Sequence, residues 1–106
     1  MYYVYMIRCL DSTIYTGITI DLSRRIKEHI TMSRKCAKYT RSHIAIKVEK
    51  AWKTDTKSLA SKLEYYIKKL SRCDKEKLIL GDISGIVFLC KNIEVEKYTL
   101  MEKIII

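Results

Sequence analysis

The first twenty residues carry two short runs that are rich in β-branched and aromatic side chains. The runs span residues 2–9 and 14–20, and a polar turn sequence lies between them at residues 11–13. Two such runs around a short polar break predict a β-hairpin. Because side chains alternate along a strand, Tyr15 and Gly17 are expected on the same face of the second strand.

The apolar pattern then changes to a helical period. An apolar residue recurs at every fourth position from Leu22 to Ile30, and Asp21 is a good N-cap for a helix that begins at Leu22. Arg25 and His29 are also four residues apart, so we expect them together on the polar flank of this apolar stripe.

The polar and basic residues 31–43 have no clear period and predict a loop or a broken helix. A third strand is expected after them, because β-branched residues alternate with polar ones there. Its apolar face is predicted to consist of Ile44, Ile46, Val48 and Trp52, with Lys50 as an interruption.

The most regular apolar repeat lies in the second half of the chain. It predicts a helix after residues 54–56, with apolar positions at Leu59, Leu63, Ile67 and Leu70. Glu64 borders the face that this helix would bury. A short helix is expected over residues 74–80, with Gly81 just beyond its end. Residues 86–106 contain apolar runs without a helical repeat and predict one or two further strands.

Charge adds a candidate partner to this picture. The length of 106 residues allows one domain, and 21 Lys and Arg against 12 Asp and Glu give a net charge of +9. A lysine-rich bias without a binding role is one explanation. However, residues 24–53 hold ten Lys and Arg against two Glu, whereas residues 86–106 hold three of each sign. This uneven distribution favours DNA. The candidate phosphate-binding cations are Arg24, Lys27, Arg34, Lys35, Lys38 and Arg41.

Other sequence features concern location and metal binding. The start of the chain lacks the basic region and small-residue cleavage site of a signal peptide, and no apolar run has the length of a membrane span. We therefore expect a cytoplasmic protein without membrane contact. The gaps between the four cysteines are 27, 37 and 17 residues, which disfavours a zinc site. Buried free thiols are expected.

Three features suggest chemistry. Four tyrosines lie in the first fifteen residues, and Gly17 leaves room for a ligand beside them, although aromatic residues also simply suit strands. Arg25 with His29 suits an anion such as phosphate, whereas a solvated helix flank is the simpler interpretation. Glu64 at the edge of an apolar face suits a metal, and an ion pair with Lys68 is the alternative.

The chain resembles the GIY-YIG nuclease superfamily, and above all its small stand-alone bacterial members, in the segments "YVYMIRC", "IYTGITIDLSRRIKEH", "KYTR" and "LEYYIKKLSRCDKEKLI". The resemblance covers about residues 2–82. It implies an α/β fold in which helices flank a three-stranded antiparallel sheet. Residues 1–82 would form the nuclease domain, and residues 83–106 would be a C-terminal extension packed on the same domain. It also implies metal-dependent cleavage of DNA phosphodiester bonds.

Two strand motifs carry much of this resemblance. They are Tyr3, Val4 and Tyr5 in the first strand and Tyr15, Thr16 and Gly17 in the second. Tyr3 stands where the family name has Gly, and Thr16 stands where it has Ile, but neither position supplies the reactive atom. Ile18 stands where some members carry a Lys, which leaves the tyrosines as the candidates for the catalytic base.

The catalytic residues that the resemblance implies are Tyr5, Tyr15, Arg25, His29 and Glu64. Arg25 would contact the phosphate. Glu64 would bind Mg²⁺ or Mn²⁺, and one carboxylate is enough for a cation that keeps most of its waters. Nearby positive charge favours a phenolate, so either Tyr5 or Tyr15 fits the role of base. His29 would orient that tyrosine or relay its proton.

The leading hypothesis is a Mg²⁺-dependent endonuclease that prefers branched, flapped or single-stranded DNA over a particular base sequence. Its rivals are a non-catalytic nucleic-acid-binding module and a nuclease subunit that needs a protein partner. Residues 86–106 lie outside the resemblance, and we expect them to cover a sheet edge or to form a homodimer contact.

Overall fold

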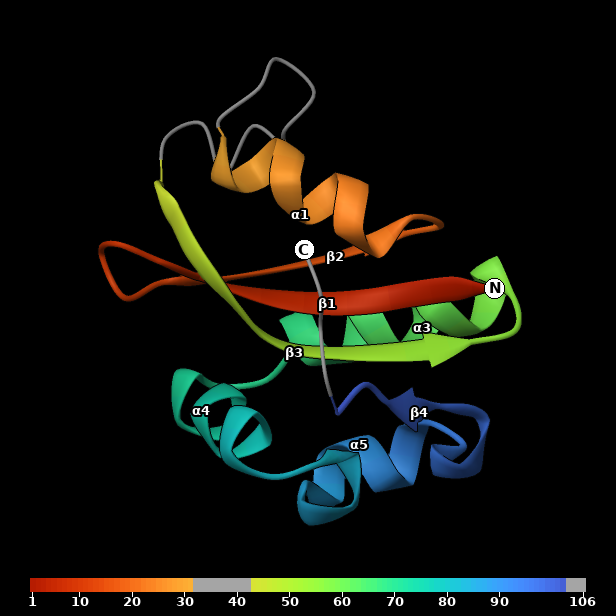
Figure 1. The fold of residues 1–106 in the computed structure, drawn as a ribbon. Coiled ribbons are helices and arrows are strands. Elements are labelled where there is room, and N and C mark those ends of the chain that lie inside the picture. The colour runs from red at the N-terminus through yellow and green to blue at the C-terminus, as the bar shows by residue number, and fades with distance from the viewer. Residues whose placement is uncertain (32–42, 103–106) are drawn as a thin grey trace.

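A single antiparallel sheet of four strands runs through the described part of the chain (Figure 1). A computed structural model describes residues 1–31 and 43–102, so most of the loop or broken helix expected over 31–43 lies outside the described residues. The strands are β1 (Tyr2–Cys9), β2 (Ile14–Thr19), β3 (Ala45–Thr54) and β4 (Thr99–Leu100), in the spatial order β2-β1-β3-β4. The expected α/β fold is confirmed, and the sheet has one strand more than the three that the resemblance implies.

Helices cover both faces of this sheet (Figure 1). On one face lies α1 (Leu22–Ile30). On the other lie α3 (Lys57–Lys68), α4 (Arg72–Leu80) and α5 (Val87–Asn92), together with 3₁₀ turns at Ile83–Gly85 and Val95–Lys97. The sheet therefore separates two layers of buried side chains.

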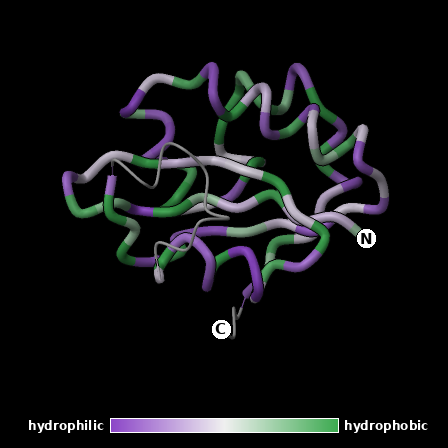
Figure 2. The backbone as a smooth tube through the Cα atoms, turned by 90° about the horizontal axis from the view of Figure 1, so that it is seen from above, coloured by the Kyte–Doolittle hydropathy of each residue, from purple (hydrophilic) through white to green (hydrophobic). Residues whose placement is uncertain are grey.

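Strand β1 contributes to both layers because it lies between β2 and β3. The α1-side core consists of Tyr5, Ile7, Cys9, Leu22, Ile26, Ala45 and Ala51. The α3-side core is larger and contains Val4, Met6, Trp52, Ala60, Leu63, Ile67, Leu70, Leu78, Ile83, Ile86, Leu89, Ile93 and Tyr98. Figure 2 shows hydrophobic residues recurring along the strands, whereas hydrophilic residues are frequent in the outer turns.

Capping residues fix where the helices begin. The side chain of Asp21 accepts a hydrogen bond from the backbone N–H of Arg24 at 3.2 Å, which confirms the predicted start of α1. Thr56 caps α3 in the same way. The third predicted helix begins at Arg72 rather than at residue 74, because Ser71 caps it.

The predicted apolar face of β3 is wrong in its first half. Ile44 and Ile46 are exposed, and the buried residues of β3 are Ala45, Ala51, Trp52 and Thr54. The pairing of β1 with β3 shifts register after Met6 and again after Arg8. Such irregularities move an alternating pattern from one face of a strand to the other, so a strict period of two does not hold along β3.

Over the described residues 86–102 helical turns predominate, so the prediction of one or two strands over residues 86–106 holds only in part. One short strand, β4, does form and pairs with β3 at Trp52 and Lys53. The apolar runs before it belong to α5 and to two 3₁₀ turns, because short helices bury single residues such as Ile86, Leu89 and Ile93 without a visible repeat.

Two further expectations from the sequence concern the cysteines and membrane-spanning segments. Cys9 is buried, but Cys73 and Cys90 are exposed, so the expectation of buried thiols holds for one of the three described cysteines. Cys36 lies outside the described residues. Among residues 1–31 and 43–102, no helix has the length and apolar character needed to cross a membrane.

The burial of α5 predicts that residues after 82 stabilise the whole fold. Leu89 is fully buried in the α3-side core, whereas Val87 on the same helix is 68% exposed. Leu89→Ala should lower the free energy of unfolding by ~2–5 kcal/mol, because it removes buried methyl groups and leaves a cavity. The measurement is urea unfolding with Val87→Ala as the matched control, for which we expect less than ~1 kcal/mol. Equal effects of the two substitutions would contradict the packing of α5.

Candidate active site

The absence of a side chain at Gly17 makes room for Tyr5. The two residues face each other across the β1–β2 ladder. A Cβ atom built at position 17 would lie 2.6 Å from the Tyr5 hydroxyl oxygen and 2.8 Å from Cζ of its ring. Glycine is therefore required because the ring of Tyr5 lies against its Cα. The space beside Gly17, where the sequence predicted room for a ligand, is partly occupied by the ring of Tyr5.

His29 is a core residue rather than a flank residue of α1. Its side chain is fully buried, and Ile30, which the apolar period places in the core, is partly exposed. The buried positions of α1 are Leu22, Ile26 and His29, a spacing of four and then three residues. This corrects the prediction that His29 lies beside Arg25 on a polar flank.

Three aromatic rings meet between β1, β2 and α1. The Tyr5 hydroxyl and Nε2 of His29 are 2.9 Å apart in a buried hydrogen bond. The ring of Tyr15 lies 5.3 Å from that of His29 and 6.3 Å from that of Tyr5, measured between ring centres. Tyr5 is 1% exposed, whereas Tyr15 is partly exposed. Solvent or a substrate thus reaches this aromatic cluster from the side of Tyr15.

Burial sets the protonation of all three rings. It lowers the pKa of His29 to about 4, with a further contribution from the charge of Arg25, so the imidazole is neutral at pH 7. Burial also raises the pKa of Tyr5 and that of Tyr15, while Arg25 opposes both shifts. The sequence argument expected nearby positive charge to favour a phenolate. In the protein by itself, the loss of solvation is larger, and both phenols stay protonated.

Arg25 connects this cluster to solvent. Its guanidinium is 2.9 Å from a carboxylate oxygen of Glu28, one turn later on α1, and the Arg25 side chain is about one quarter exposed. A hydrogen bond with Arg25 also acts on the pKa of the Tyr5 hydroxyl. Since a guanidinium only donates, the Tyr5 oxygen accepts from Arg25 and can give its own proton to His29.

Helix α3 brings a second ion pair to the other side of Tyr15. Glu64 is 3.4 Å from the ammonium of Lys68, the pair that the sequence offered as the simpler alternative. The same ammonium lies 5.9 Å from the ring centre of Tyr15. Because β2 is at the edge of the described sheet, α1 and α3 approach Tyr15 from opposite faces. We call this arrangement the β2 edge site and define it by Tyr5, Tyr15, Arg25, His29, Glu64 and Lys68.

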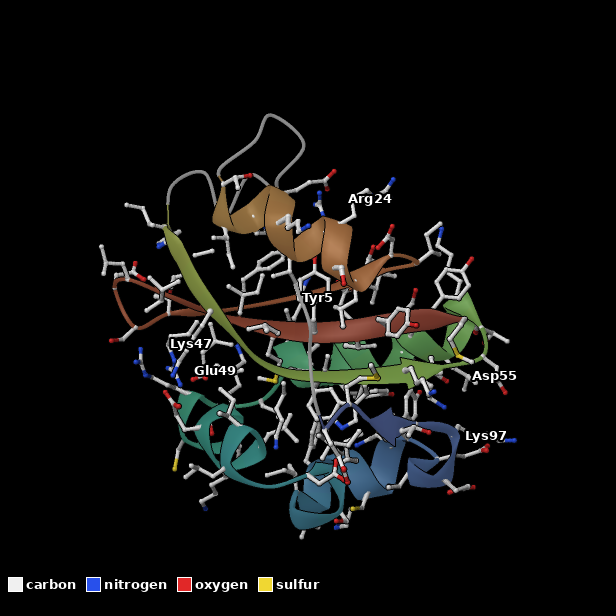
Figure 3. The ribbon with its side chains drawn as sticks, viewed as in Figure 1. Tyr5, Arg24, Lys47, Glu49, Asp55 and Lys97 are labelled. Carbon is white, nitrogen blue, oxygen red and sulfur yellow. The ribbon has the colours of Figure 1, made fainter. Side chains whose placement is uncertain are left out.

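The remaining candidate residues have simpler places. Val4 and Thr16 are buried in the strands, and Tyr3 packs against the α1-side core. Arg24 and Lys27 are exposed on α1, and Figure 3 shows Arg24 pointing away from the sheet while Tyr5 lies between the sheet and α1. The other four predicted phosphate contacts, Arg34, Lys35, Lys38 and Arg41, lie outside the described residues.

Two contacts at or beside the site were not predicted from the sequence, one made by Glu28 and one by Lys68. Glu28 pairs with Arg25, and its spacing of three residues on a helix is the signal that could have found it. Lys68 contacts both Glu64 and Tyr15, but only the first contact follows from helical spacing. Within residues 1–31 and 43–102, no three His, Cys, Asp or Glu side chains form a metal-binding group.

Comparison with known proteins assigns the class. Residues 1–77 match the GIY-YIG catalytic domain, and the chain belongs to this family. The family is one of endonucleases that generally depend on a divalent metal ion. The match includes β1, β2, α1, β3 and α3, which carry every described residue of the β2 edge site.

More specific similarity is to UPF0213 proteins. A UPF0213 protein of Fusobacterium nucleatum is 46% identical over 78 residues, which are 74% of this chain and 76% of that protein. One from Halobacterium salinarum is 45% identical over 78 residues, 74% of this chain and 99% of that protein. The solution NMR structure of a UPF0213 protein from Bacillus halodurans is 40% identical, covers 74% of this chain and 83% of its own, and has a TM-score of 0.44.

The contact between Gly17 and Tyr5 predicts a stability effect. Gly17→Ala places a methyl group on the Tyr5 ring, which cannot move away because it is buried, and should lower the free energy of unfolding by ~1–3 kcal/mol. Urea unfolding measures this. Gly85→Ala is the matched control, since nothing lies within 4 Å of a Cβ at that position, and its effect should stay within ~0.5 kcal/mol. A Gly17→Ala protein as stable as the control would show that Tyr5 does not occupy this space.

The neutral imidazole of His29 predicts a pH dependence of stability. Between pH 6.5 and about 4 the unfolded chain binds a proton at this residue that the folded chain does not, so stability falls as the pH falls. The free energy of unfolding, measured with urea, should be about 2 kcal/mol lower at pH 5 than at pH 7. His29→Gln should remove most of this difference, while His43→Gln, at the partly exposed second histidine, should keep it. An unchanged pH dependence in His29→Gln would refute the assignment.

Proposed function

We propose that this protein is a metal-dependent DNA endonuclease that prefers branched, flapped or single-stranded DNA. The observation that carries the proposal is the hydrogen-bonded aromatic cluster of Tyr5, His29 and Tyr15, with Arg25 beside it at the edge of the described sheet. Packing alone does not require a neutral imidazole that is hydrogen-bonded to a phenol next to a guanidinium.

Phosphate is the part of the substrate that this site is suited to hold. The Arg25 side chain is about one quarter exposed, so its positive charge can attract an anion from solvent while the guanidinium stays bonded to Glu28 and Tyr5. Arg24 and Lys27 are exposed on the same helix. These side chains offer charge to a backbone rather than a pattern of donors and acceptors to base edges. Such contacts support a preference for the shape of the DNA backbone over a base sequence.

The exposure of the two tyrosines supports different roles for them. Tyr15 is partly exposed and is the one that an attacking water can approach. Tyr5 is buried behind it and bonded to His29, so it acts as a positioning residue. The imidazole of His29 is neutral, and its Nε2 lies at the Tyr5 hydroxyl. This nitrogen can therefore accept the proton of that hydroxyl during the reaction. Arg25 then faces the negative charge that develops on the phosphate.

Glu64 fits a hard divalent cation. Mg²⁺ or Mn²⁺ takes carboxylate and phosphate oxygens and keeps several waters, so a single protein carboxylate is sufficient. The Glu64 side chain is about one quarter exposed. The Lys68 ammonium that pairs with it is on an exposed side chain, so it can move aside when a cation binds. When bound, such a cation supplies charge neutralisation at the phosphate.

Cleavage assays test the proposal. Purified protein is incubated with labelled duplex, flapped and single-stranded DNA in Mg²⁺ or Mn²⁺, and with EDTA. We expect cleavage that EDTA abolishes and that falls by about 10² to 10³ in Arg25→Ala, Glu64→Gln and Tyr15→Phe. Glu96→Gln, an exposed carboxylate in the turn before β4 at the opposite edge of the described sheet, and Tyr98→Phe, which loses a buried hydroxyl bond to Leu59, are the matched controls and should cleave as the parent does.

The outcomes separate this proposal from its rivals. Cleavage that persists in all three site variants would mean a contaminating nuclease or a different site. Binding without cleavage by the parent protein would favour a non-catalytic binding module or a subunit that needs a partner.

A further inference from the structure

A second cationic feature lies at the turn of the hairpin. A pocket of about 210 Å³ opens between the β1–β2 turn and the start of α4, and it is lined by Ser12, Thr13, Ile14, Arg72 and Lys75. Of these five described residues, two are cations and none is acidic. The Arg72 side chain is 61% exposed, so its charge is accessible from solvent.

Two carboxylates close to this pocket are paired with Arg8. Arg8 bonds Glu76 through both terminal nitrogens, at 2.5 and 2.7 Å, and also bonds Glu49 at 3.1 Å. Lys47 adds a further positive charge 3.4 Å from Glu49. Because Arg8 neutralises Glu76, which is 3.9 Å from Arg72, the charges of Arg72 and Lys75 are left without full compensation. The side chains that line the pocket therefore carry positive charge and no negative charge.

The pocket is also held in shape by the groups that line it. The carbonyl oxygen of Ser12 accepts a hydrogen bond from Arg72 at 3.0 Å and another from Arg8 at 3.1 Å. Arg72 therefore ties α4 to the hairpin turn while its other guanidinium donors remain able to bind an anion. A cation that is already positioned loses less side-chain entropy when an anion binds.

The position of the pocket connects it to the β2 edge site. Ile14 lines the pocket and is followed on the same edge strand by Tyr15. Lys68, which lies over Tyr15, is at the end of α3, and Arg72 begins α4 four residues later. The edge strand β2 and the connection between α3 and α4 therefore both extend from the aromatic cluster toward the pocket. An extended polyanion on the site would pass along this line.

We propose that the pocket between the hairpin turn and α4 binds a second, uncleaved phosphate of the nucleic acid strand whose scissile phosphate lies in the β2 edge site. This inference rests on the proposed endonuclease function. Arg72 and Lys75 are the positioning residues, and their contribution is to hold the strand rather than to act on the reacting atoms.

Binding measurements provide the first test. The variant Arg72→Ala/Lys75→Ala is compared with Lys91→Ala/Lys97→Ala, which removes the same charge from exposed positions of the C-terminal segment. Affinity for a labelled single-stranded oligonucleotide is measured by fluorescence anisotropy over a range of salt. We expect a roughly tenfold higher Kd for the pocket variant, and a log–log salt slope shallower by about 0.7, the value for one single-strand phosphate. The control should stay within about twofold of the parent protein.

Single neutral phosphates in the substrate provide the second test. A methylphosphonate is placed at one position at a time, and KM and kcat are measured for the parent and for the pocket variant. We expect one position, away from the cleaved bond, where the substitution raises KM in the parent but has no further effect in the variant. The kcat at saturating substrate should be unchanged in both cases, because the pocket does not touch the reacting atoms.

The results distinguish this inference from the proposed function. A pocket variant that binds and cleaves as the control does, or substitutions that act equally on both proteins at every position, would overturn the phosphate pocket while cleavage by the parent stands. If the parent does not cleave at all, the proposed function fails, and the anisotropy comparison alone then decides whether the pocket binds a nucleic acid phosphate.

Discussion

Much of this structure depends on the close approach of one aromatic ring to one glycine. Tyr5 lies across the hairpin ladder from Gly17, and any side chain at position 17 would overlap its hydroxyl. The ring can therefore lie low on the sheet, beneath α1, where its oxygen meets Nε2 of His29. The same contact packs the α1-side core and brings the polar atoms of the site together. Stability and chemistry are for this reason difficult to change separately at these positions.

Local signals predicted much of the fold, because each has a physical cause in a few neighbouring residues. The side chains of Asp21 and Thr56 cap α1 and α3 through backbone N–H groups three residues later, and such bonds need no tertiary information. The hairpin and the apolar stripe of α3 follow from alternation and helical period in the same way. Tyr15 and Gly17 were predicted on the same face for this reason, and the ring of Tyr15 does lie beside Gly17.

The parts that the sequence did not predict depend on contacts between distant segments. His29 is polar, so a hydropathy pattern places it outside the core, although Tyr5 supplies the hydrogen bond that permits its burial. The register shifts between β1 and β3 arise from pairing across about forty residues, and they reverse the face of Ile46. The helices after residue 82 are too short to show a repeat. Proximity of Lys68 to Tyr15 likewise requires the packing of α3 on the hairpin.

The position of β2 at the edge of the described sheet has a consequence beyond the site that it forms. An edge strand presents unpaired N–H and C=O groups to which a strand of another molecule can add, and charged side chains along the edge oppose this addition. Here Lys68, Arg72 and Lys75 stand beside β2 and its turn. They repel a second copy of the same basic chain by the same field that attracts an anion. The side chains that keep copies of this protein apart are therefore the same ones that are proposed to bind an anion. Neutralising Lys68, Arg72 and Lys75 would favour self-association and would also weaken anion binding.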